Sequence, residues 1–136
     1  MKNLVMLLII SGCFVVFSCG EKESDRFKLL TDPIWVTDSL LANGIDATGG
    51  ILKKFKGEAK FNKDGTGTFG TYKGEWDFNV DETKLIITSD SLPLPVNTDI
   101  LELTNTSLKL KTLFPDPKDP FNPASIINIR MTFKAK

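Results

Sequence analysis

Strict alternation of apolar and polar residues near the C-terminus is the feature that most restricts how this chain can fold. The alternation is clearest where polar residues separate four apolar ones, Ile127, Ile129, Met131 and Phe133. A period of two is typical of a β-strand, in which successive side chains point to opposite faces. Residues 75–80 and 108–111 repeat the pattern. Most of the chain after residue 57 is therefore predicted to form strands with one buried face and one face in water.

Short turn sequences separate these runs at regular intervals. Asp64-Gly65 is typical of a hairpin, and residues 81–84 and 105–106 predict tight turns. The sequence predicts eight strands, near residues 34–40, 57–62, 66–72, 74–80, 84–89, 98–104, 107–113 and 125–134. The only helix expected is a turn or so over residues 51–56. We therefore predict an all-β fold, an eight-stranded antiparallel up-and-down barrel, because closing the sheet removes its edges.

The first 25 residues predict export rather than a part of the fold. Lys2 precedes a nearly unbroken apolar run over residues 4–17, and charged residues follow at once. The run is shorter than the roughly 20 residues that a membrane-spanning helix needs, and its flanks are typical of a cleaved signal peptide. We expect residues 1–18 to be the signal, residues 19–27 a polar tether and residues 28–136 one barrel domain.

Two cysteines are candidates for a lipid anchor, because a small residue followed by Cys resembles the lipobox of bacterial lipoproteins. Cys13 follows two small residues, whereas bulky Phe17 lies two positions before Cys19. Cleavage at Cys13, however, would leave an apolar start and shorten the apolar run to the low edge of the usual range. Cys19 is therefore the preferred anchor and Cys13 the alternative. Secretion after ordinary signal cleavage, without lipid, is a third reading.

Lipidation of Cys19 would place the mature protein on a membrane. More than one acyl chain anchors a protein firmly, since each buried CH₂ contributes about 0.8 kcal/mol. The expected location is the outer membrane, with the protein exported and facing either the periplasm or the cell surface. The acidic run over residues 21–25 resembles signals for surface export, and a solvated tether explains it equally well.

Composition argues against several classes of function. The chain has no histidine, which removes the commonest general base, and no cysteine follows Cys19. After residue 18 there are 16 Lys and Arg against 17 Asp and Glu, so no basic field favours nucleic acid. Residues 62–73 resemble the start of a calcium loop, but Lys73 lies where a ligating Glu is required. We expect no enzyme, no catalytic residue, no cofactor, no metal site and no nucleic-acid partner.

The hairpin segments resemble a known family, the lipocalin-like domain of small lipoproteins from Gram-negative bacteria. The similarity covers about residues 28–134, with its motifs at residues 61–68, 74–76, 84–88, 100–104, 108–110 and 131–134. The resemblance implies an eight-stranded meander barrel behind an N-terminal lipid anchor, and it implies no particular activity. The first strand has Pro33-Ile34-Trp35 where the broader lipocalins carry Gly-x-Trp.

The barrel interior and one long loop are the candidate sites. An eight-stranded barrel is wide enough either to be filled by side chains or to hold one small ligand. The candidate ligand-binding residues are those expected to face inward, Trp35, Trp76, Phe78, Leu108, Leu110, Ile129, Met131 and Phe133. Phe114 and Phe121, in a connector with four prolines, are candidates for a lid. Arg130 is expected to face solvent, with stacking against Trp35 as the alternative.

Two functions of different classes fit these expectations. The first is the binding of a small, largely apolar ligand inside the barrel. The second is a non-catalytic interaction or structural module that contacts another envelope protein through its loops. An open interior of a few hundred Å³ favours the first function, and a filled barrel favours the second.

We expect Cys19→Ser to release the protein from membranes and Cys13→Ser to leave it bound, because the thiol of Cys19 is the expected site of acylation. Fractionation of cells that produce each variant, followed by detection in the soluble and membrane fractions, measures this. The opposite result would place the start of the mature chain at Cys13.

Overall fold

The computed structural model of this protein describes residues 22–47, 49–116 and 118–136. The expected signal and both candidate anchors, Cys13 and Cys19, lie outside these residues. In chain order the elements are α1 (Asp25–Thr31), β1 (Trp35–Ala42), β2 (Ile45–Asp46), α2 (Gly50–Lys53), β3 (Glu58–Phe61), β4 (Thr66–Phe69), β5 (Tyr72–Phe78), β6 (Lys84–Thr88), β7 (Val96–Leu103), β8 (Ser107–Pro115) and β9 (Ile126–Ala135). In the described part of the chain, no helix has the length and apolar character needed to cross a membrane.

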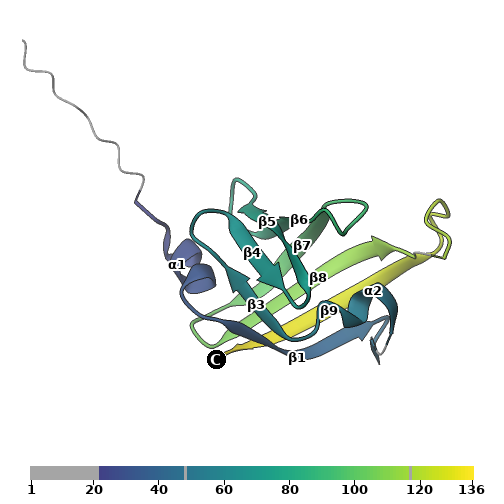
Figure 1. Cartoon of the computed structure of the whole chain (residues 1–136), viewed down its shortest axis with the longest axis horizontal. Helices are drawn as coiled ribbons and strands as arrows, with labels where there is room; N and C mark the ends of the chain where they lie inside the picture. The colour runs from purple at the N-terminus through teal and green to yellow at the C-terminus, as the bar shows by residue number, and fades with distance from the viewer. Residues whose placement is uncertain (1–21, 48, 117) are drawn as a thin grey trace, which may run out of the picture.

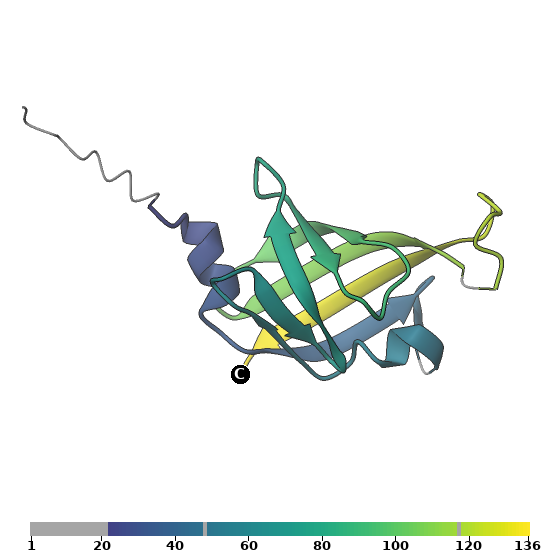
Figure 2. The same cartoon turned by 45° about the horizontal axis from the view of Figure 1, so that its top comes forward.

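The strands form a closed barrel. From β3 to β9 each strand pairs antiparallel with the next, and β1 pairs with both β3 and β9 (Figures 1 and 2). The barrel therefore consists of β1 and β3 to β9, and β2 is one extra strand that pairs with the end of β1. The predicted eight-stranded antiparallel barrel is confirmed.

Side chains alternate across the wall as the sequence predicts. Ile129, Met131 and Phe133 of β9 are buried, whereas Arg130 between them is exposed. Arg130 pairs in register with residues 41 and 111, and Trp35 pairs with residue 135 at the far end of β9. Arg130 thus does not stack on Trp35, because the two residues lie at different heights of the barrel.

A β-bulge explains why one predicted strand alternates poorly. The register between β7 and β8 shifts between Ile100 and Glu102, so that Leu101 is an extra residue on β7. Bulges bend a strand and interrupt its alternation. Leu101 is accordingly 55% exposed although it is apolar.

Two turns differ from the predicted ones. Asn43 and Gly44 have φ of 51° and 81° and join β1 to β2, a strand that is absent from the predicted set although Asn-Gly is a strong hairpin signal. The turn between β4 and β5 is at residues 70–71, earlier than predicted. Gly70 has a φ of 60° there, which glycine adopts without steric cost.

Helix α1 was not among the predicted elements, and its first turn lies within the expected tether. Ser24 caps the helix, because its hydroxyl oxygen accepts a hydrogen bond of 3.0 Å from the N–H of Phe27. The same hydroxyl donates to a carboxylate oxygen of Glu82 at 2.7 Å, and Arg26 donates to the Glu82 carbonyl at 2.9 Å. Residues 25–27 are therefore part of the folded domain.

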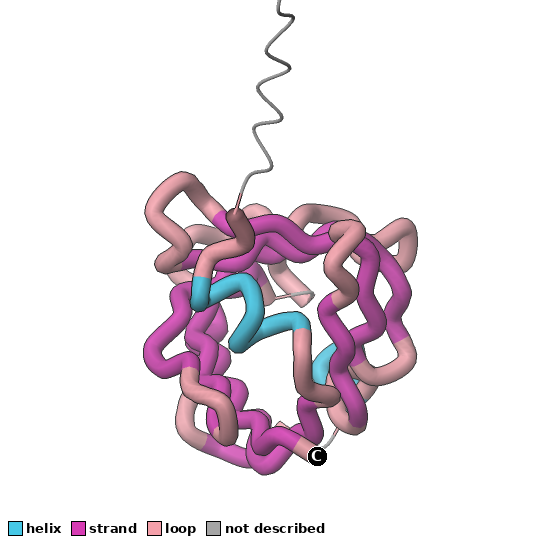
Figure 3. The backbone as a smooth tube through the Cα atoms, turned by 90° about the vertical axis from the view of Figure 1, so that its left-hand side faces the viewer, coloured by secondary structure: helices cyan, strands magenta, loops and turns pink. Residues whose placement is uncertain are grey.

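The other half of α1 closes one end of the barrel (Figure 3). Leu30 is fully buried, and its carbonyl accepts a hydrogen bond of 3.0 Å from the indole N–H of Trp35. The ammonium group of Lys60 on β3 donates to three carbonyls at the end of the helix and just past it, those of Thr31, Asp32 and Pro33. A cation is favourable at this position, where helix carbonyls lack partners. We call the end of the barrel that α1 covers the closed end.

We expect Met131→Asp to unfold the domain or to cost several kcal/mol, because it buries a charge without a partner. Arg130→Asp should change the free energy of unfolding by about half a kcal/mol or less, as exposed substitutions usually do. Urea denaturation of both variants measures the difference, with Met131→Leu as a control that keeps the volume. Equal losses for the two Asp variants would contradict the alternation.

Candidate functional site

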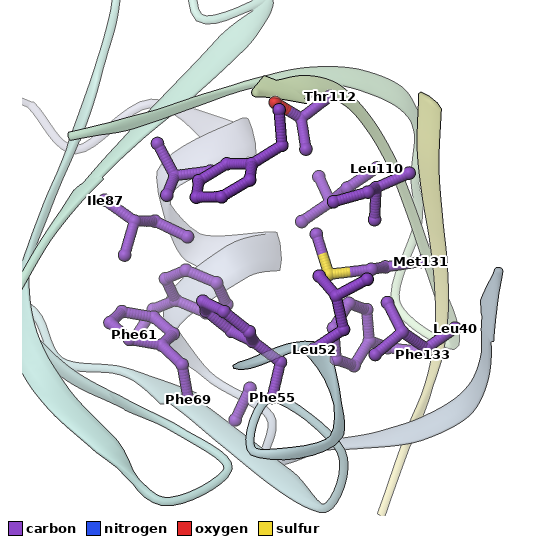
Figure 4. Close-up of a pocket in the computed structure, with 14 residues that line it drawn as sticks. Leu40, Leu52, Phe55, Phe61, Phe69, Ile87, Leu110, Thr112, Met131 and Phe133 are labelled. Atoms are coloured by element: carbon purple, nitrogen blue, oxygen red, sulfur yellow. The ribbon is translucent and has the colours of Figure 1, made fainter. Parts of the chain in front are cut away.

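An apolar cavity lies inside the barrel toward the end that α2 covers (Figure 4). The lining residues come from α2, from the segment just after it and from the strands, namely Leu40, Leu52, Phe55, Ala59, Phe61, Phe69, Ile87, Val96, Leu110, Thr112, Phe114, Ile129, Met131 and Phe133. The cavity volume is about 30 Å³, enough for a water molecule or two and far below the roughly 300 Å³ of a small ligand site. The barrel is therefore filled by its own side chains in this conformation.

The cavity offers no free polar group to an occupant. Thr112 is the one polar residue in its lining. The Thr112 hydroxyl donates a hydrogen bond of 2.6 Å to the carbonyl of Asn97, on the neighbouring strand. Because this group is already satisfied, the cavity favours apolar atoms.

Helix α2 and the residues after it cover this end of the barrel. Leu52 and Phe55 are three residues apart, so both point to the same side and enter the cavity (Figure 4). Both side chains are only partly buried, as is Phe114 of β8, whereas the other strand residues that line the cavity are buried. We call residues 50–56 the lid.

The lid is attached to the β4–β5 turn by a close backbone contact. The N–H of Thr71 donates to the Lys54 carbonyl at 2.9 Å. A Cβ atom on Gly70 would lie 2.1 Å from the same carbonyl oxygen. Only glycine therefore allows the lid to approach the turn this closely.

Tyr72 lies directly under the lid. Its ring centroid is 4.6 Å from that of Phe55. Burial raises the pKa of Tyr72 above its usual value, because the charged phenolate is poorly solvated there. Tyr72 is the single tyrosine of the chain, so its ionisation reports how well the lid covers this site.

A groove of about 480 Å³ lies outside the barrel, between the lid and the ends of β8 and β9. It is lined by Gly49, Gly50, Leu52, Phe114, Asp116, Lys118 and Ile127. Leu52 and Phe114 line both this groove and the cavity. These two side chains, which we call the portal, therefore lie between the barrel interior and the groove.

Four of the eight predicted ligand-binding residues line the cavity, namely Leu110, Ile129, Met131 and Phe133. The other four face inward but lie nearer the closed end. Trp35 contacts Leu30, and Leu108 is fully buried. The indole of Trp76 donates to the Asn62 carbonyl at 3.0 Å, and its ring lies 5.5 Å from that of half-buried Phe78.

The two candidate lid residues have different positions. Phe114 is part of the portal, whereas Phe121 is 96% exposed and lines neither the cavity nor the groove. The loop around Phe121 is closed by its own backbone hydrogen bonds, such as that from Asp116 to the Ser125 carbonyl at 2.9 Å. It projects away from the barrel (Figure 1).

Nine cavity residues were not among the predicted site residues, namely Leu40, Leu52, Phe55, Ala59, Phe61, Phe69, Ile87, Val96 and Thr112. Sequence signals exist for some of them. Thr112 continues the alternation of residues 108–111, and Ala59 and Phe61 alternate with charged neighbours. Leu52 and Phe55 have the spacing of one helix face.

Exposed carboxylates of the described residues stabilise turns. Hydrogen bonds from Thr66 hold the pKa of Asp64 below its usual value, and those from Thr83 do the same for the pKa of Asp81. Within residues 22–47, 49–116 and 118–136, no group of three or more His, Cys, Asp or Glu side chains is placed to hold a metal ion.

Comparison with known proteins gives no relative: no family model matches the chain, and no curated protein matches it. The function is therefore argued from the geometry of the barrel.

We expect Phe55→Ala to lower the pKa of Tyr72 toward its usual value, because the phenol then meets water. Titration of the tyrosinate absorbance in the near ultraviolet measures this pKa. Phe121→Ala is the matched control, since that ring is exposed and distant from the cavity lining, and it should leave the titration unchanged. An unchanged titration in Phe55→Ala would mean that the lid does not shield Tyr72.

Proposed function

We propose that this protein is a membrane-anchored, non-catalytic lipoprotein of the lipocalin-like type, whose barrel binds a small, largely apolar ligand. One observation carries the proposal: an enclosed apolar cavity is separated from an open groove by only two side chains, Leu52 and Phe114. Rotation of these two side chains would connect the groove with the cavity and so give a ligand access to the barrel interior.

Binding requires the lid to move, because the cavity of about 30 Å³ is too small for a ligand. Fully burying a Leu or Phe side chain contributes about 1.5–3 kcal/mol, so exposing the partly buried Leu52 and Phe55 costs roughly 2–3 kcal/mol in total. A cost of that size leaves the open form populated at roughly 1%. The ligand would then occupy the space that these two side chains vacate.

Ligand entry requires one end of the barrel to open more easily than the other, and the contacts at the two ends differ in this way. The closed end is held by the Trp35 indole, by Lys60 and by the Ser24 cap of α1. The lid is held by its backbone bond to Thr71 and by an exposed ion pair of 3.0 Å between Lys56 and Asp46. Exposed ion pairs contribute only about 0–1 kcal/mol, so opening at the lid costs less than opening at α1.

The proposed anchor is compatible with this arrangement. The described chain begins beside α1, at the closed end, and the lid lies at the opposite end (Figure 1). A lipid on Cys19 would therefore leave the portal unobstructed. The proposed location is the outer membrane, with the barrel in the periplasm or at the cell surface.

A second function, an interaction module for another envelope protein, is favoured by the filled interior and by exposed apolar residues. Five of these lie in or beside the β1–β2, β6–β7 and β8–β9 connections around the lid end, with exposed fractions of 74% for Ile45, 59% for Leu94, 62% for Leu113, 96% for Phe121 and 47% for Ile126. Apolar residues gathered at one end of a molecule are typical of a contact surface.

We expect apolar probes such as aromatic dyes and sterols to raise the melting temperature. A free probe concentration of 100 times the dissociation constant should add about 2.7 kcal/mol to the free energy of unfolding. Dye emission measures binding directly, which matters because neither indole lines the cavity.

Phe114→Ala should speed release of the dye by opening the portal. Leu113→Ala, which removes the exposed neighbour on the outer face, is the matched control and should not. If no probe changes the melting temperature, the ligand proposal fails and the interaction module becomes the better account.

A further inference from the structure

We propose that a second groove, on the outer side of the barrel beside α1, binds an extended segment of a partner protein in which an arginine lies between two apolar residues. This groove has a volume of about 670 Å³ and is lined by Phe27 of α1, by residues 63–66 and by residues of β5 and β6. We call it the edge groove. It shares no lining residue with the cavity, so this inference does not depend on ligand binding inside the barrel.

Three aromatic residues line part of the edge groove. Phe27 and Phe78 are half-buried. The ring centroid of Trp76, the third, lies 5.6 Å from that of Phe27 and 5.5 Å from that of Phe78. Because two of these rings stay partly exposed, covering them with apolar side chains of a partner is favourable.

The edge groove is negatively charged. Its lining holds three carboxylates, those of Asp64, Glu75 and Asp77, against the one ammonium group of Lys63. Lys63 is paired at 3.1 Å with Glu23, which is not part of the lining. Within the described residues, neither Glu75 nor Asp77 forms an ion pair, and no three acidic groups are placed to hold a metal ion. The fitting occupant is therefore an organic cation, and a guanidinium binds carboxylates best because its donors match their geometry.

A strand edge without a partner adjoins these side chains. β4 pairs with β5 only as far as Thr66 opposite Glu75, whereas β5 continues to Phe78. The N–H of Trp76 donates to the Gly65 carbonyl at 2.8 Å, and the alternation of an antiparallel strand turns the N–H and C=O of Phe78 to the same side. No strand of the described chain pairs with Phe78 there. Such an edge can accept an added strand through main-chain hydrogen bonds.

The geometry of an added strand determines the sequence that fits. Its successive side chains point to opposite sides of the sheet. A side chain opposite Asp77 lies beside that carboxylate and within reach of Glu75 on the diagonal. Its two neighbours in the segment point to the other side, toward the rings of Phe27 and Phe78. The pattern that fits is therefore apolar, arginine, apolar.

This chain does not supply such a segment itself. Residues 129–131 have the pattern, but they lie in β9, which pairs with β1 on one side and with β8 on the other. The other arginine of the chain, Arg26, donates to the carbonyl of Glu82. The segment therefore belongs to a different protein.

The test compares two peptides that differ only in charge. The first is a capped nine-residue peptide with Val-Arg-Val at its centre and threonines on both sides, and the second has citrulline, a neutral isostere, in place of the arginine. Magnetic resonance titration uses the nitrogen-15-labelled, unlipidated chain of residues 20–136, which contains every described residue. We expect the amide signals of Gly65 and Phe78 to shift, and the citrulline peptide to bind about tenfold more weakly at low salt. Added salt should reduce this difference.

Variants assign the preference to the edge groove. The double variant Glu75→Gln, Asp77→Asn should lower the affinity for the arginine peptide to that for the citrulline peptide, and should leave the citrulline peptide unaffected. The control Asp38→Asn, Asp90→Asn removes the same charge from exposed positions outside the lining and should change neither affinity.

N-methylated peptides test the pairing with the strand edge. Alternate N–H groups of a strand point to opposite edges, so methylation of every second nitrogen blocks one edge, and the alternative set blocks the other. One of the two methylated arginine peptides should lose binding, because its methyl groups face Phe78, and the other should keep it.

Three results would each overturn the inference. The first is equal affinity for the arginine and citrulline peptides, or an unchanged preference in the groove variant. The second is full binding of both methylated peptides, which would mean that the strand edge is not used. The third is that the arginine peptide does not bind at all. None of these results bears on the barrel ligand, because the cavity has a separate lining.

Discussion

Pairing between β1 and β9 is the interaction on which the rest of the structure depends. It runs from Trp35 opposite Ala135 to Ala42 opposite Ile129 and removes both edges of the sheet. On its other edge β1 pairs with β3 only at Trp35 and Val36, and with β2 at Leu41 and Ala42. The chain between β1 and β3 is therefore free to leave the wall, and it forms β2 and the lid there. The covered mouth is thus a consequence of how the barrel closes.

Stability is distributed unequally between the two ends. At the closed end, buried Leu30 and Trp35 combine a fully apolar environment with a satisfied indole and satisfied helix carbonyls. At the lid end, the side chains that complete the core come from one short helix and the residues just after it, and they remain partly exposed. Segments with few buried contacts open at lower free energy than the global unfolding of a domain. The position of the candidate site follows from this difference.

The period of two was sufficient to predict the eight barrel strands, though not β2, together with their antiparallel order and the faces of β9. Burial on one side of a sheet makes apolar and polar residues alternate in the sequence. Alternation gives the side of the wall but not the height along the barrel axis, so Trp35 and Trp76 could not be distinguished from Met131 as lining residues. The height of a residue along the barrel axis depends on how neighbouring strands are staggered, and the register of strand pairing sets that stagger. Helix α1 is too short to show a clear period of 3.6 and was not predicted, whereas the helical turn predicted over residues 51–56 overlaps α2. That these segments cover the barrel ends is recognisable only once the ends are known.

The contact between Gly70 and the lid gives one position unusual influence over the whole interior. The carbonyl of Lys54 occupies the space where any other residue would carry its first side-chain carbon. A barrel of this design with a larger residue at that position would have to hold its lid farther from the β4–β5 turn. The residue at this one position, which is not itself part of the cavity lining, is therefore a structural marker of whether the lid of such a barrel rests closed or partly open.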